Sequence, residues 1–166
     1  ILTNLLSRIF SRAARVRGED RGDGGDDLER GYRLQQAGDR AAAERCYRGV
    51  LKLDPRNADA RYLLGALLGE MGKLEEAAAH LDQALAARPG FAAAHAARGN
   101  VFLALDERRA AAASYRQALR YDPDNAIAHF NLGLILQTSG ARAQALHHFA
   151  RAYELAPDIP HLLTDL

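Results

Sequence analysis

The chain has 166 residues, of which 22 are basic and 21 acidic, so its formal charge is +1. That balance gives no overall reason to expect a nucleic acid or an acidic substrate as the partner. A hydrophobic content of 48%, rich in alanine and without tryptophan, suits closely packed helices better than a sheet. The single cysteine, Cys46, excludes an intrachain disulfide and a cysteine-rich metal site, and we expect a cytoplasmic protein.

Residues 1–17 contain no acid and carry an apolar stripe beside four arginines, which predicts a basic amphipathic helix, with an unstructured tail as the alternative. Such a helix would lie on an anionic membrane surface, dock into a groove of its own or a neighbouring chain, or act as a transit peptide. No apolar run approaches the roughly 20 residues that span a bilayer. Residues 18–27 are rich in glycine and aspartate and predict a flexible linker.

Residues 24–159 repeat with a period of 34 residues. Glycine stands at the eighth place of each repeat and proline at the thirty-second, and two residue types that share one period predict a solenoid of helix pairs. The repeats are 24–57, 58–91, 92–125 and 126–159. The glycines are Gly31, Gly65, Gly99 and Gly133, and the prolines are Pro55, Pro89, Pro123 and Pro157.

Other places of the repeat predict how the two helices pack and end. Place twenty is always alanine and place twenty-four is always large, as interdigitated helix faces require. Glycine at place fifteen suits a helix C-terminus, but the third repeat has Asp106 there, so we expect its turn to be made differently. Asn57 and Asn125 are predicted N-caps.

This pattern resembles the tetratricopeptide repeat family, in the form found in bacterial proteins. The resemblance implies an all-α, right-handed superhelical solenoid of antiparallel helix pairs. Place four departs from the family, which often has tryptophan where this chain has Asp27, Arg61, His95 and His129. Residues 160–166 would begin a capping helix or a fifth repeat, and their early stop suggests a fragment of a longer protein or self-association through this end.

In the family, certain places of each first helix line a concave groove that binds peptides. Carried onto this chain, these places give an apolar surface with two amides, so we expect a protein or peptide partner bound through an apolar peptide or helix. Residues 1–17 would be one such ligand, and their docking on another copy would give self-association. The predicted groove residues are Tyr32, Tyr62, Leu63, Asn100, Leu103, Phe130, Asn131 and Leu134. The basic clamp that some relatives use for a C-terminal carboxylate is missing.

We expect no catalysis, no cofactor, no metal and no nucleic-acid partner, because the sequence has no nucleophile–base pair, phosphate-binding loop or zinc spacing. His95 and His129 are interpreted as bulky core residues rather than metal ligands. Residues 126–158 also resemble the repeats that precede O-linked N-acetylglucosamine transferases. One alternative is therefore the substrate-recruiting region of a larger glycosyltransferase or methyltransferase, and another is a membrane-surface adaptor that attaches through residues 1–17.

Overall fold

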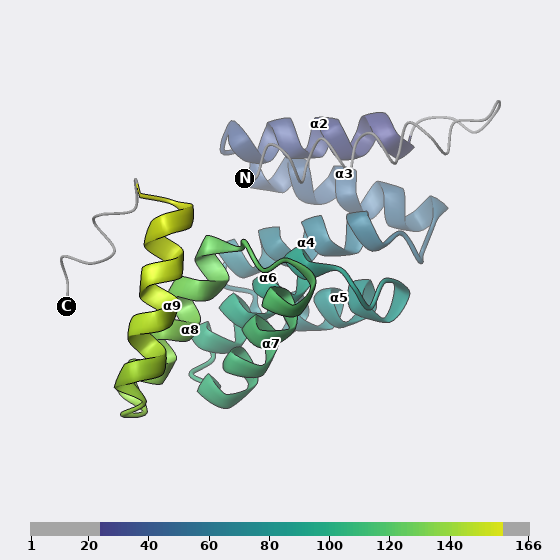
Figure 1. The fold of residues 1–166 in the computed structure, drawn as a ribbon. Helices are drawn as coiled ribbons and strands as arrows, with labels where there is room; N and C mark the ends of the chain where they lie inside the picture. The colour runs from purple at the N-terminus through teal and green to yellow at the C-terminus, as the bar shows by residue number, and fades with distance from the viewer. Residues whose placement is uncertain (1–23, 158–166) are drawn as a thin grey trace. The chain divides into compact units, whose positions relative to one another are not determined.

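The structure, a computed structural model, describes residues 24–157, and this part of the chain is entirely helical apart from its turns. Consecutive helices form four hairpins, as Figure 1 shows. The all-α repeat architecture predicted from the period is confirmed. The helices are α2 (Gly24–Gln36), α3 (Arg40–Leu53), α4 (Ala58–Glu70), α5 (Leu74–Ala87), α6 (Ala92–Ala104), α7 (Arg108–Tyr121), α8 (Ala126–Thr138) and α9 (Arg142–Leu155).

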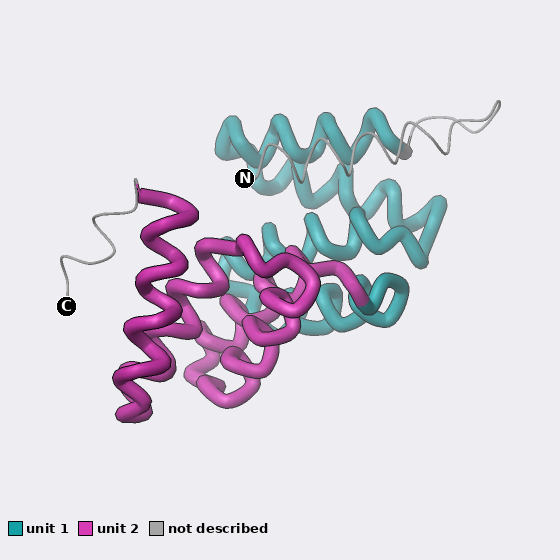
Figure 2. Tube along the Cα trace, viewed as in Figure 1, with its two compact units in different colours: residues 1–89 teal, residues 90–166 magenta. Residues whose placement is uncertain are grey.

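The chain divides into two compact units, residues 1–89 and residues 90–166 (Figure 2). Unit 1 contains α2 to α5, and unit 2 contains α6 to α9. Within unit 1, α3 packs on α4 and joins the two hairpins, and α7 packs on α8 in the same way within unit 2. Residues 24–27, which fall in the predicted linker as well as in the first repeat, belong to the first turns of α2. The predictions for residues 1–17 and 160–166 lie outside the described residues.

Each hairpin is closed by a contact between the glycine at place eight and the large side chain at place twenty-four. A methyl group added to Gly99 would lie only 2.6 Å from Cε1 of the Tyr115 ring, closer than side chains tolerate. The glycine therefore lets the two helices approach until the ring fills the space between them. The corresponding distances are 2.6 Å for Gly31 and Tyr47, 2.8 Å for Gly65 and Leu81, and 2.7 Å for Gly133 and Phe149.

Alanine and further apolar side chains complete the core of each unit. The alanines at place twenty are all buried, and they let the second helix lie close to its neighbours. In unit 2 the cluster of buried residues includes Ala111, Tyr115, Leu132 and Ala145. Across residues 24–157, no helix has the length and apolar character needed to cross a membrane.

The helix ends follow the sequence signals closely. Oδ1 of Asn57 accepts a hydrogen bond from the Ala60 N–H at 2.9 Å, and Oδ1 of Asn125 accepts one from Ala128 at 3.0 Å, so both predicted N-caps are confirmed. The glycines at place fifteen adopt the left-handed region with φ between 75° and 85°.

The third turn contradicts the prediction made for Asp106. This residue has φ 58°, and its turn makes the same two hydrogen bonds as the glycine turns, Asp106 N to Leu103 O at 3.0 Å and Glu107 N to Phe102 O at 2.8 Å. The prediction was wrong because aspartate tolerates the left-handed region better than most residues with a side chain. The helices on either side then impose one turn geometry on all four repeats.

We expect Gly99→Ala to lower the free energy of unfolding by about 2 kcal/mol, because the added methyl group overpacks against Tyr115. The matched control is Gly49→Ala in α3, where an added Cβ meets nothing within 4 Å. That change should raise stability by about 0.5–1 kcal/mol through helix propensity alone. Urea unfolding followed by circular dichroism measures both, and equal stability of Gly99→Ala and the wild type would show that the contact does not limit the approach of the helices.

Replacing Asp106 by glycine, the residue of the other three turns, should stabilise the protein. Asp106→Gly removes the left-handed strain but adds chain entropy to the unfolded state, so we expect a net gain of about 0.5 kcal/mol. Asp106→Ala keeps the strain without the tolerance of aspartate and should lose about 1 kcal/mol. Thermal midpoints in the order Gly, Asp, Ala would agree with this account, and any order that places Ala above Gly would contradict it.

Candidate peptide-binding surface

The eight predicted groove residues all lie on the first helices of their hairpins, and the two units share them unequally. Unit 1 holds one on α2 and two on α4, and unit 2 holds two on α6 and three on α8. We refer to the exposed or half-buried members in unit 2 as the first-helix face. They are Asn100, Leu103, Asn131 and Leu134.

In unit 1 the predicted residues are more buried than a binding groove requires. Tyr62 is 9% exposed and Leu63 4%, while Tyr32 is half-buried. Burial raises the pKa of Tyr62 to about 12, and the nearby Tyr32 and Glu70 add to the effect. Glu70 accepts a hydrogen bond of 3.0 Å from Nε2 of Gln35. A carboxylate therefore belongs to this surface, and the sequence-based list did not include it.

In unit 2 three polar side chains from three helices bond to one another. The Tyr115 hydroxyl donates to Oδ1 of Asn100 at 2.7 Å. Nδ2 of Asn131 donates to the same Oδ1 at 3.1 Å and to the Tyr115 hydroxyl at 3.1 Å. The two amides predicted from α6 and α8 are thus brought together, and a tyrosine of α7 holds them in place.

This network leaves a donor and an acceptor on the surface. Neither the Nδ2 hydrogens of Asn100 nor the Oδ1 of Asn131 takes part in a hydrogen bond within residues 24–157. Asn100 is exposed and Asn131 half-buried. Because a peptide backbone offers one acceptor and one donor per residue, these groups match it.

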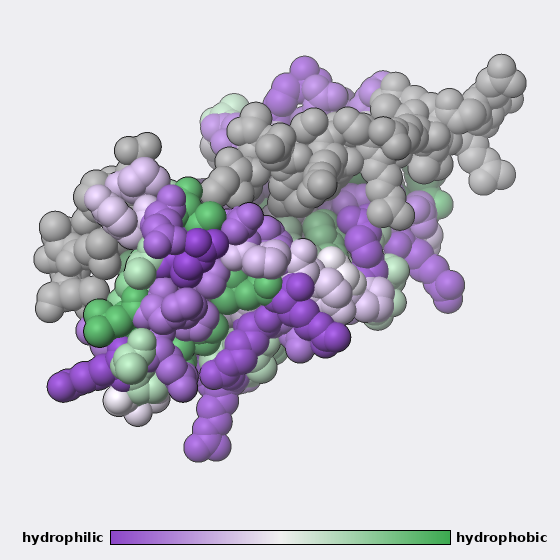
Figure 3. Space-filling model, viewed as in Figure 1, coloured by the Kyte–Doolittle hydropathy of each residue, from purple (hydrophilic) through white to green (hydrophobic). Residues whose placement is uncertain are grey.

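Apolar side chains surround the amides. Leu103 and Leu134 are half-buried, and Ile127, at place two of the fourth repeat, is 50% exposed. In the space-filling view, hydrophobic patches alternate with hydrophilic side chains (Figure 3). Phe130 is only 8% exposed and packs on Phe149, with ring centroids 5.7 Å apart. The surface open to a ligand therefore consists of leucines, an isoleucine and amides rather than aromatic rings.

Two residues of this surface were missed by sequence reasoning. Tyr115 was assigned to the core from its place in the repeat, and its ring is indeed buried, but its hydroxyl positions both asparagines. Ile127 occupies a place that lines the groove in the family, so the family pattern contained the signal for it.

A second set of polar contacts links places four and twenty-three of the repeat. Arg61 donates from Nε and Nη2 to the Pro55 carbonyl, at 3.2 and 2.9 Å, and its Nη1 lies 3.1 Å from Nδ1 of His80. In the fourth repeat, Nε2 of His129 lies 3.0 Å from the Pro123 carbonyl, and its Nδ1 lies 2.8 Å from Nδ1 of His148. These side chains tie the proline turn to the hairpin that follows it.

The protonation states follow from the partners. Because arginine only donates, Nδ1 of His80 accepts and the ring is neutral with its proton on Nε2. His129 faces the Pro123 carbonyl through Nε2 and so donates there, and its Nδ1 shares a hydrogen bond with Nδ1 of His148.

Burial is the main cause that lowers the pKa of His80, assisted by Arg61 and Arg48 and opposed by Glu76 and Glu44. Burial also lowers the pKa of His148, with His129, His147 and Arg116 acting in the same direction.

The histidines within the described part of the chain show no geometry for a shared metal. Both ring nitrogens of His129 have partners, and His95 stacks on Tyr121 at 5.7 Å between ring centroids. Across residues 24–157, no group of three or more His, Cys, Asp or Glu side chains is placed to hold a metal ion.

Family profiles match most of the repeat region. Two described as tetratricopeptide repeat match residues 34–101 and 126–159, and one described as TPR repeat matches residues 109–140. The chain belongs to the tetratricopeptide repeat family. Among curated proteins, the uncharacterized protein y4yS of Sinorhizobium fredii is 36% identical over 113 residues, which cover 68% of this chain and 62% of that protein. The chain therefore spans less than two thirds of this relative.

Solved structures of the same fold include MamA and a repeat domain of Spaghetti (RPAP3). A crystal structure of MamA has a TM-score of 0.73 and 21% identity, and the match covers 93% of this chain and 88% of that one. The first repeat domain of Spaghetti (RPAP3), bound to the HSP90 peptide SRMEEVD, has a TM-score of 0.68 and 23% identity, with 70% and 93% covered. At this level of identity the likeness shows the fold alone.

The histidine contacts predict that this tetratricopeptide protein loses stability in mild acid. Unfolded histidine takes up a proton near pH 6.5, whereas His80 and His148 resist protonation in the folded state, so unfolding takes up protons below that pH. The stability is fully present above the unfolded pKa and is lost as the pH falls through the lower folded values. We expect the thermal midpoint to fall between pH 7.5 and 5.5.

The variant His80→Asn/His148→Asn keeps an amide near the position of Nδ1 and should show a smaller fall over the same pH interval. An identical fall in the variant and the wild type would assign the acid sensitivity to other groups.

Proposed function

We propose that the chain is a protein-interaction scaffold that binds an apolar peptide or helix on the first-helix face of unit 2, and that it acts by binding rather than by catalysis. The hydrogen-bonded group of Asn100, Tyr115 and Asn131 is the observation that carries this proposal. It holds an amide donor and an amide acceptor at fixed positions between apolar side chains.

Pre-organisation is what favours a binding role for this group. An asparagine that is free to rotate loses conformational entropy when a ligand orders it, whereas the amides of Asn100 and Asn131 are already held by each other and by the buried Tyr115. The ligand backbone then gains hydrogen bonds at a smaller entropic cost. Leu103, Leu134 and Ile127 would contact the ligand's apolar side chains.

Unit 1 is assigned a lesser part in binding. Tyr62 and Leu63 have little surface to offer, and Glu70 places a carboxylate next to them. Tyr62 in unit 1 and Phe130 in unit 2 are both buried. Replacing either by alanine would therefore test the stability of the core as much as the binding of a ligand. Loss of a buried aromatic side chain costs about 3–5 kcal/mol of stability.

The chemistry of the ligand follows from the charge of the face. The four residues of the first-helix face carry no charge, so an acidic tail such as the HSP90 peptide seen with Spaghetti (RPAP3) has no basic partner among them. An apolar stripe suits the leucines better. The sequence of residues 1–17 predicts such a stripe and contains no acid, so it is the natural basis for a probe peptide.

The first-helix face is tested by placing charges on it. We expect Leu103→Glu/Leu134→Glu to weaken binding of a fluorescein-labelled peptide of residues 1–17, with its four arginines replaced by glutamine, by about tenfold or more, because each glutamate must be desolvated against an apolar ligand. The glutamines remove the attraction that the arginines would have for the added glutamates. Both leucines are only half-buried, so the helices should stay folded. Fluorescence polarisation measures the affinity, and circular dichroism checks the fold.

The matched control is Leu146→Glu, which adds a glutamate at a leucine that is 69% exposed on the second helix of the same hairpin. This variant should bind the probe as the wild type does. Wild-type affinity in the double variant would rule out the first-helix face as the binding site. An equal loss of affinity in the control would attribute the effect to the added charge alone.

A further inference from the structure

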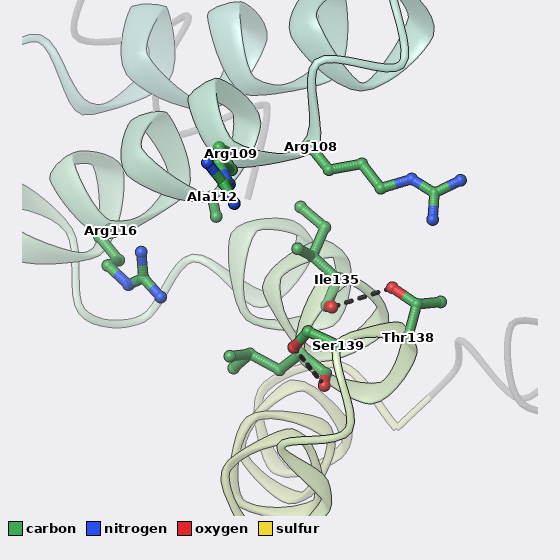
Figure 4. A pocket seen from close by; sticks show the side chains of 8 residues that line it. Arg108, Arg109, Ala112, Arg116, Ile135, Thr138 and Ser139 are labelled. Carbon is green, nitrogen blue, oxygen red and sulfur yellow. Dashed lines mark hydrogen bonds between the residues drawn. The ribbon is translucent and has the colours of Figure 1, made fainter.

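A cavity of about 410 Å³ opens between α7 and α8 in unit 2, apart from the first-helix face (Figure 4). The second helix of one hairpin forms one wall, and the last turns of the next first helix form the other. The residues that line it are Arg108, Arg109, Ala112 and Arg116 from α7, and Ile135, Leu136, Thr138 and Ser139 from α8 and its C-cap.

The cavity carries positive charge that its surroundings do not neutralise. The sequence of α7 has four arginines and no acid, and α8 has no charged residue. Arg108 pairs with Asp106 at 2.9 Å, but both side chains are largely exposed, at 57% and 80%, so the pair contributes little. Arg109 and Arg116 form no ion pair with any residue in 24–157.

The charge preference of a helix N-terminus does not explain Arg108 and Arg109. Arg108 and Arg109 lie in the first turn of α7, where the helix dipole disfavours positive charge. The equivalent turn of α5 holds Glu75 and Glu76, as the dipole favours, whereas α3 and α9 each begin with a single arginine. The first turn of α7 therefore gives up a favourable charge arrangement, and an anionic ligand would restore it.

The remaining walls restrict the ligand further. Ala112, Ile135 and Leu136 give an apolar floor, and Leu136 is buried in the core cluster. The hydroxyls of Thr138 and Ser139 donate to the Ile135 and Leu136 carbonyls at 2.9 and 2.8 Å, so they can only accept from a ligand. Figure 4 shows both bonds. A bare anion would leave the apolar floor and these acceptors unused.

We propose that this cavity binds an acidic peptide segment of a partner protein. Carboxylates pair with Arg109 and Arg116, an apolar side chain of the peptide lies on the half-buried Ile135, and peptide N–H groups reach the hydroxyls. Arg109 and Arg116 are seven residues apart, about 10 Å along the helix, which two acids of one short segment span. No aromatic side chain lines the cavity to stack a base, which disfavours a nucleic acid.

The test uses the full chain and a ten-residue fluorescein-labelled peptide in which pairs of aspartates alternate with single leucines. We expect Arg109→Gln/Arg116→Gln to weaken binding by about tenfold or more, since charge-assisted hydrogen bonds are lost. Arg120→Gln makes the same kind of change on the same helix outside the cavity and should leave the affinity within about a factor of two. A peptide with asparagine in place of aspartate should bind weakly.

Three results would overturn the proposal: an equal loss in Arg120→Gln, undiminished binding of the asparagine peptide, or a single-stranded oligonucleotide that binds more tightly and displaces the acidic peptide. The Leu103→Glu/Leu134→Glu variant should still bind the acidic peptide, because its changes lie outside the cavity. Failure at one surface is thereby distinguished from failure at the other.

Discussion

The approach of the Tyr115 ring to Gly99 determines both the packing of unit 2 and the polar chemistry of its surface. Because the glycine has no Cβ, the Tyr115 ring packs directly against it, and the Tyr115 hydroxyl reaches Asn100 and Asn131. Tyr47 does the same in unit 1, where its hydroxyl donates to Oε1 of Gln35 at 3.1 Å. The residue that closes each of these hairpins therefore also orients an amide on the first-helix side. The packing of the repeat and the proposed binding surface therefore share one side chain, Tyr115.

At place four of the repeat, polar side chains stand where apolar side chains would usually pack between helices. Burying an arginine or a histidine between helices is unfavourable unless each polar atom finds a partner. Arg61 and His129 meet this condition through the carbonyl of the preceding proline and a histidine of the second helix. The proline turns are thus held by side chains as well as by backbone geometry. The link between each of these proline turns and the hairpin after it therefore includes His80 or His148, whose pKa is lowered mainly by burial.

The local features could be predicted from the sequence. The features that depend on contacts between residues far apart in the chain could not. The helix pairs, the caps at Asn57 and Asn125 and the close contacts of the repeat glycines follow from spacing and side-chain type. Asp106 was predicted wrongly because local preference was weighed without the flanking helices, which impose the turn. The bond between Asn100 and Asn131 joins residues 31 positions apart, and the burial of Tyr62 depends on neighbouring helices. Neither is visible in a periodic pattern, which describes what repeats and not which side chains meet.

The two proposed surfaces of unit 2 arise where the repeats differ from one another. The glycines, alanines and prolines that recur in all four repeats are used up in packing and turns, so they leave nothing with which to recognise a ligand. Asn100 and Asn131 stand at different places of successive repeats and meet only because two hairpins adjoin. Arg109 and Arg116 have no counterpart in α5, whose first turn is acidic. Specificity in such an array therefore has to come from its irregular positions, and in unit 2 these give an uncharged face and a basic cavity suited to different ligands.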